Sequence, residues 1–129
     1  MSELPVLLLA EDDEDDQFLF QEALASVHSD IECIMVNNGK EAMRLLQQDI
    51  FTLPDYIFLD LNMPVMDGMD CLASLKQDPN LKDIPVIIYS TTITELILDQ
   101  SRKLGVHSTF KKPDSIDSLS DFLRQFLNL

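Results

Sequence analysis

The stretch that decides the fold is residues 56–68, which read YIFLDLNMPVMDG. Its first four residues are apolar and predict the end of a buried strand. Asp60 follows this strand directly, and the chain then turns through Pro64 and the pair Asp67-Gly68. Ligands bind at the carboxyl ends of strands in an open α/β sheet, so an acid at this place is presented to chemistry. The structural alternative is an Asp that merely caps the following turn.

Length and composition indicate one compact globular domain. The chain has 129 residues, of which 46% are hydrophobic and only three are Gly. A chain of this size buries roughly two thirds of its unfolded surface around a single core. We therefore expect one domain over residues 1–129. The apolar run of residues 4–10 is too short to cross a membrane and is followed by acids, so we expect no signal peptide, no membrane contact and a cytoplasmic location.

The charge argues against nucleic acids as partners, and the spacing of the cysteines argues against a metal site. The net charge is −14, from 23 acidic and 9 basic residues, which repels nucleic acids but suits a divalent cation or a basic patch on a partner protein. Cys33 and Cys71 lie in apolar segments without the spacing of metal ligands. They are expected to be buried, reduced thiols.

Strand and helix patterns alternate five times along the chain. This alternation predicts an α/β fold: a five-stranded parallel sheet with helices on both faces, a flavodoxin-like doubly wound (βα)5 arrangement. The expected strands are residues 4–9, 31–36, 55–59, 85–89 and 108–111. The expected helices follow each strand, with caps at Asn38, at Thr92 in a Thr92-x-x-Glu95 capping box, and at Asp114 or Ser115.

The apolar pattern predicts which residues of the first two helices face inward. In the first helix the expected inner residues are Phe18, Leu19, Ala23, Leu24 and Val27. In the second helix they are Ala42, Leu45, Leu46 and Ile50.

A run of six acids, residues 11–16, separates the first strand from the first helix. Glu14, Asp15 and Asp16 fall at the helix start, where acids cap free N–H groups and meet the positive end of the helix dipole. We assign these three acids that structural role. Glu11 and Asp12 differ, because they fall at the carboxyl end of the strand.

Several polar side chains follow directly on predicted strands, namely Glu11, Asp12, Asp60, Ser90 and Lys112. All ends of parallel strands share one edge, so these residues are expected to converge there. Two carboxylates ~4 Å apart repel by roughly 4 kcal/mol at an effective dielectric constant of about 20, so a cation or raised pKa values must accompany three of them.

Oxygen ligands without His or Cys favour Mg²⁺ at this edge. Asp60 is placed to act as a nucleophile toward phosphorus, since a bound metal would neutralise the charge of an arriving phosphoryl group. Lys112 would supply a positive charge for phosphate oxygens, and Ser90 a hydroxyl donor.

These residues resemble the receiver domain of two-component response regulators over the whole chain. The resemblance rests on Glu11-Asp12, on Asp60-Leu61-Asn62-Met63-Pro64 with Met66-Asp67-Gly68, on Ser90, and on Lys112-Pro113. The loop lengths and the Lys-Asp-Ile-Pro entry to the fourth strand resemble the stand-alone receivers that partner phytochrome-type kinases. A single receiver domain, with no output domain before the chain ends at Leu129, is thus expected.

The resemblance implies a role for each matching residue. Asp60 would accept a phosphoryl group from a histidine kinase or a histidine phosphotransfer protein. Asp12 would bind Mg²⁺ directly and Glu11 through water, together with Asp60 and the backbone carbonyl of Asn62. Ser90 and Lys112 would contact the phosphoryl oxygens. Such a chain is a signalling switch that acts on a downstream protein and is no enzyme beyond its own phosphotransfer and dephosphorylation.

Three positions depart from the family pattern. Asp13 follows the acid pair, so the pair is either Glu11 and Asp12, which strand register favours, or Asp12 and Asp13. Thr91 stands where a small Ala or Gly is common, and its bulk would narrow access to the phosphoryl group. Thr109 replaces the usual aromatic residue that changes rotamer on activation, while Phe110 should point to the opposite face of the strand.

Other functions fit the sequence less well. A phosphatase of the haloacid dehalogenase class needs a second Asp two residues after the nucleophile, and that position is Asn62. A calcium loop starting at Asp12 has Gln17 where a Gly must turn the chain. A nucleotide-binding fold lacks its Gly-rich loop. A receiver fold kept only as a scaffold remains an alternative.

Overall fold

The computed structural model describes residues 4–49 and 52–129. Within these residues five strands form one fully parallel sheet in the order β2-β1-β3-β4-β5. The strands are β1 Val6–Ala10, β2 Glu32–Val36, β3 Tyr56–Leu59, β4 Val86–Ser90 and β5 Ser108–Lys111. The predicted strands are thus confirmed, with ends that differ by up to two residues.

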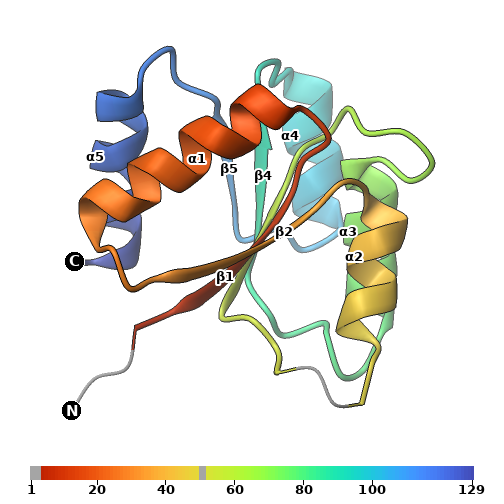
Figure 1. The fold of residues 1–129 in the computed structure, drawn as a ribbon. Helices are drawn as coiled ribbons and strands as arrows, with labels where there is room; N and C mark the ends of the chain where they lie inside the picture. The colour runs from red at the N-terminus through yellow and green to blue at the C-terminus, as the bar shows by residue number, and fades with distance from the viewer. Residues whose placement is uncertain (1–3, 50–51) are drawn as a thin grey trace.

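Five helices of the described residues cover the two faces of the sheet. They are α1 Glu14–Val27, α2 Gly39–Leu46, α3 Gly68–Gln77, α4 Glu95–Lys103 and α5 Ile116–Leu127. Helices α1 and α5 lie side by side on one face, and α2, α3 and α4 cover the other (Figure 1). This is the doubly wound α/β fold that the alternation predicts. No helix in the described ranges is both long and apolar enough to span a bilayer.

The two faces of the sheet bury different kinds of side chain. Successive residues of β1 point to opposite faces, so Leu7 and Leu9 pack under α1 and α5 while Leu8 and Ala10 pack under α2 and α3. The layer under α1 and α5 is rich in aromatic rings, whereas the other layer is mainly aliphatic. Together the two layers bury every residue of β4 and all but the first residue of β1 and of β3, which explains the uninterrupted apolar sequences of these strands.

The inner face of α1 differs from the prediction. Phe18 is 60% exposed and Leu19 is 36% exposed, whereas Phe20 is fully buried with Ala23 and Leu24. Phe20 was not expected inside, yet residues 20, 23, 24 and 27 follow helical spacing and form one stripe. The ring of Phe20 also packs edge-on against Phe58 and Tyr89, which fixes the rotation of the helix.

The helix caps are mostly as predicted. Asn38 accepts a hydrogen bond from the Glu41 N–H at 2.8 Å, and Ser115 caps α5. The prediction for α4 is wrong, because its cap is Thr94, whose hydroxyl accepts from the Ile97 N–H. Ile50, expected on the inner face of α2, lies outside the described residues.

The two cysteines differ in burial. Cys71 is buried as expected, whereas Cys33, on the edge strand β2, is only half-buried. Burial raises the pKa of each thiol to about 12, which keeps both protonated at neutral pH. Both are free thiols, as the sequence predicts.

Candidate functional site

The residues expected at the edge of the sheet are held there by the backbone of neighbouring strands. The Glu11 N–H donates to the Val36 carbonyl at 3.0 Å, and the Asp60 N–H donates to the Ala10 carbonyl at 3.0 Å. The Lys112 N–H donates to the Ser90 carbonyl at 2.8 Å. Each bond extends the parallel ladder one residue beyond a strand end. Five strands thus bring segments that are far apart in sequence to one rim.

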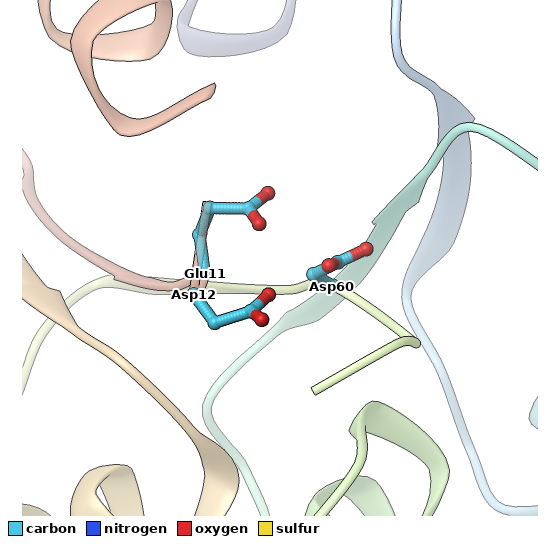
Figure 2. A group of neighbouring side chains, drawn as sticks. All are labelled: Glu11, Asp12 and Asp60. Atoms are coloured by element: carbon cyan, nitrogen blue, oxygen red, sulfur yellow. The ribbon is translucent and has the colours of Figure 1, made fainter. Parts of the chain in front are cut away.

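Three carboxyl groups meet at this rim. Each of Glu11, Asp12 and Asp60 contributes one oxygen to a group in which these atoms lie within 4.8 Å of one another. The Glu11 and Asp12 carboxyls extend from the end of β1 toward Asp60 (Figure 2). Glu11 is fully buried and Asp60 is 5% exposed, while Asp12 is exposed and opens the group to solvent. The convergence of these three residues, predicted from their place after strands, is present in the fold.

Lys112 supplies a positive charge beside these carboxyls. Its ammonium donates to Glu11 Oε1 at 2.5 Å and to Asp16 Oδ2 at 2.8 Å, and it lies 3.6 Å from Asp60 Oδ1. The side chain is only 7% exposed, and its Nζ lies 5.4 Å from the centre of the Tyr89 ring. One buried ammonium therefore contacts carboxylates from three different segments.

The geometry favours Glu11 with Asp12 over the alternative pair of Asp12 with Asp13. Glu11 uses its second oxygen to accept from the Asp13 N–H at 3.1 Å, so both of its oxygens are engaged. Asp13 is instead the N-cap of α1, and its side chain accepts from the Asp16 N–H at 3.0 Å. Asp13 thus serves as the cap of α1.

The loop after β3 brings the start of α3 against Asp60. A Cβ atom at Gly68 would lie 2.3 Å from the Asp60 carbonyl oxygen, so only glycine fits. Between them Val65, with a φ of 68°, is the central residue of a tight turn in which the Met66 N–H donates to the Pro64 carbonyl. Asn62 lies in this loop with its side chain exposed.

The ends of β4 and β5 supply the remaining predicted residues. Ser90 is fully buried at the end of β4, and its hydroxyl accepts from the Thr92 N–H at 3.5 Å. Thr91 is exposed beside it. Phe110 packs into the layer under α1 and α5 and stacks on Phe122, so it points away from the α4 side as predicted for its strand position.

Burial shifts the acid–base properties of the site. It raises the pKa of Glu11 to about 7, although the hydrogen bond from Lys112 acts in the opposite direction. Burial also raises the pKa of Asp60 against the attraction of Lys112. Desolvation lowers the pKa of Lys112, but its hydrogen bonds to Asp16 and Glu11 and the charges of Glu11 and Asp60 together raise it above its ordinary value. The ammonium stays charged while the buried acids hold protons more tightly than usual.

Asp16 is the site residue that the sequence prediction misses. It was assigned to the helix start, yet its carboxylate reaches the Lys112 ammonium. The available signal was only its place in the acid run directly after the first strand. Without knowing where β5 lies, the partner of Asp16 could not be named.

The donor set fits a divalent cation. The three neighbouring carboxyl groups offer oxygen ligands only, which is the preference of hard cations such as Mg²⁺, Mn²⁺ or Ca²⁺. The exposed Asp12 leaves a side open for water ligands.

Comparison with known proteins identifies the family. Residues 7–124 match the model of the response regulator receiver domain. The chain is 38% identical over 118 residues to the response regulator Rcp1 of Synechocystis sp., a match that covers 88% of this chain and 80% of that protein.

Solved structures of similar sequence have the same fold. The phosphorylated cyanobacterial phytochrome response regulator RcpA is 37% identical, with a TM-score of 0.88 over 96% of this chain and 91% of that one. The Mn²⁺-bound form of Rcp1 is 36% identical, with a TM-score of 0.84 over 95% of this chain and 91% of that one. The chain therefore belongs to the response regulator receiver domains, the phosphorylatable modules of two-component signalling.

Proposed function

We propose that this protein is a switch that accepts a phosphoryl group on Asp60 in the presence of Mg²⁺ and signals by contact with another protein. The observation that carries the proposal is the grouping of the Glu11, Asp12 and Asp60 carboxyls within 4.8 Å, with the Lys112 ammonium 3.6 Å from Asp60. The match to the receiver family supports it. The Mn²⁺ bound by the similar Rcp1 supports a divalent cation here.

The chemistry at Asp60 follows from the charges around it. A carboxylate oxygen of Asp60 forms the new bond to phosphorus as the bond from phosphorus to the donor histidine nitrogen breaks, and that nitrogen keeps the electron pair. Lys112 stabilises the charge on the phosphoryl oxygens, and the Ser90 hydroxyl donates a hydrogen bond to one of them. A bound Mg²⁺ would neutralise charge among the carboxylates and keep them ionised. Hydrolysis of the acyl phosphate then restores Asp60.

Phosphorylation is proposed to shift a pre-existing equilibrium. Moving a two-state protein from mostly off to mostly on takes about 5.5 kcal/mol of differential interaction. A hydrogen bond from Ser90 to a charged partner contributes only ~1.5–3 kcal/mol, so Lys112 and the cation must contribute the rest. The affected surface is the face formed by α4, β5 and α5, next to Ser90 and Lys112.

The proposed partners are a sensor histidine kinase or histidine phosphotransfer protein and a downstream target protein. The similarity to RcpA, a phytochrome response regulator, favours a phytochrome-type kinase as donor. A cytoplasmic location stays a prediction of the sequence. Enzymatic activity is confined, on this proposal, to the protein's own phosphotransfer and dephosphorylation.

The proposal is tested by intact mass spectrometry after incubation with Mg²⁺ and a small acyl phosphate. The wild type should gain one phosphoryl group, and Asp60→Asn should gain none. No adduct on the wild type, or an equal adduct on the variant, contradicts the proposal. A turnover assay on small phosphate esters tests the phosphatase alternative, which requires an Asp at the position that Asn62 occupies. A switch should show no turnover beyond hydrolysis of its own phosphoryl group.

A further inference from the structure

The Lys112 ammonium is shared unequally among three acids. It donates to Glu11 at 2.5 Å and to Asp16 at 2.8 Å, whereas its 3.6 Å distance to Asp60 is too long for a hydrogen bond. An ammonium has three donors, and two of these are already used. Lys112 is therefore held beside the proposed phosphoryl site by acids that are not phosphorylated.

The two acids that hold Lys112 differ in how readily they can release it. The Glu11 side chain is 1% exposed, and its other oxygen is bound to the Asp13 N–H. The Asp16 side chain is 30% exposed, so water can solvate its carboxylate if Lys112 moves away. Loss of the Asp16 contact thus costs less than loss of the Glu11 contact.

The helix does not require the Asp16 carboxylate as a cap. Asp13 already caps α1, and it does so by accepting from the backbone N–H of Asp16. Asp15, the neighbour in the same turn, is exposed and carries the same charge. The feature that sets Asp16 apart from Asp15 is its contact with Lys112.

We propose that Asp16 is a positioning residue that competes with the phosphoryl group on Asp60 for the Lys112 ammonium and so sets how strongly the phosphorylated state is favoured. This inference rests on the proposed function. An arriving phosphoryl group offers oxygens to Lys112, which gives up Asp16 and keeps Glu11. The Asp16 contact stabilises the unphosphorylated protein only, so its loss shifts the balance toward the phosphorylated form.

The experiment compares Asp16→Asn with the matched control Asp15→Asn. Both variants lose one negative charge from the same helical turn, and Asn keeps the size of Asp. The measured quantity is the dissociation constant of fluoroberyllate, a tetrahedral anion that binds a carboxylate as a phosphoryl group would, by calorimetry in Mg²⁺. Asp16→Asn should bind fluoroberyllate about threefold to tenfold more tightly than wild type, and Asp15→Asn should match wild type.

Two further variants separate positioning from structure and from general charge. Asp16→Glu keeps the carboxylate and should restore an affinity near that of wild type. In a Lys112→Met background, Asp16→Asn should no longer change the affinity, because the competed ammonium is gone. If Asp16→Asn does not fold, as judged by its circular dichroism, Asp16→Ala takes its place with the same expected gain.

The outcomes distinguish this inference from the proposed function. If the wild type binds fluoroberyllate but Asp16→Asn binds it no more tightly than Asp15→Asn, the inference is overturned and the proposed function stands. A gain that persists in the Lys112→Met background also overturns it, because the effect would then be general electrostatics. If the wild type binds no fluoroberyllate and accepts no phosphoryl group, the inference and the proposed function are both contradicted.

Discussion

Glu11 and Glu14 stand three residues apart in one run of acids, yet Glu11 is fully buried and Glu14 is exposed. Glu11 follows β1 and belongs to the cluster of carboxyls that includes Asp60, whereas Glu14 begins α1 and faces solvent. The residue type and the formal charge are the same. The comparison teaches that the position of an acid in the fold, and not the local density of acids in the sequence, decides whether it enters the site.

The largest effect expected from this comparison concerns cation binding. Glu11→Gln should weaken Mg²⁺ binding by about 10-fold to 100-fold, the range found when a residue that supports metal ligands is replaced. Glu14→Gln removes the same charge from the same run and should change the dissociation constant by less than about twofold, since exposed charges are screened. Calorimetric titration with Mg²⁺ measures both. Equal losses in the two variants would show that only the total charge matters.

A second expected effect is the pH dependence of Mg²⁺ binding. Burial raises the pKa of Glu11 to about 7, and a cation competes with the proton for this carboxylate. Between pH 8 and pH 6 the affinity of the wild type should therefore fall by roughly tenfold. Glu11→Gln has no such proton to lose, so its affinity should depend less on pH over this range. An unchanged slope in the variant would assign the titration to another group.

The smallest expected effect concerns stability, and it compares two acids at the start of α1. Asp13 is the N-cap and accepts from the Asp16 N–H, so Asp13→Ala should lower the free energy of unfolding by about 1 kcal/mol. Asp15 is an exposed acid of the first helical turn, near the positive end of the helix dipole, so Asp15→Ala should cost less, on the order of 0.3–0.5 kcal/mol. Urea unfolding in the absence of Mg²⁺ measures the difference. A larger loss for Asp15→Ala would contradict the capping assignment.

Most of the fold could be predicted because the separate sequence signals all indicate the same structure. The apolar strand runs, the helix caps at Asn38 and Ser115, and the five alternating units all favour one doubly wound sheet. The positions of Glu11, Asp12 and Asp60 at one rim then followed from parallel topology alone. Strand ends are reliable in this respect because hydrogen bonds to neighbouring strands fix them.

The prediction errors arise where contacts between elements that are distant in sequence determine the structure. Phe18 and Phe20 are both compatible with an amphipathic helix, and it is packing of Phe20 against Phe58 that places Phe20 inside. Thr92 and Thr94 both suit an N-cap, and the path of the chain out of β4 selects Thr94. Asp16 belongs to the same class, because its partner Lys112 is 96 residues away in sequence.

The proposed switch requires that Asp60 is the residue that becomes phosphorylated. Chemical identification of the phosphorylated residue tests this requirement most directly. After incubation with Mg²⁺ and a small acyl phosphate, borohydride reduces an aspartyl phosphate to homoserine, which peptide mass spectrometry locates in the chain. We expect homoserine at position 60, and none when Mg²⁺ is removed by a chelator. Homoserine at Asp12 or Asp16 in place of Asp60, or at no position, would contradict it.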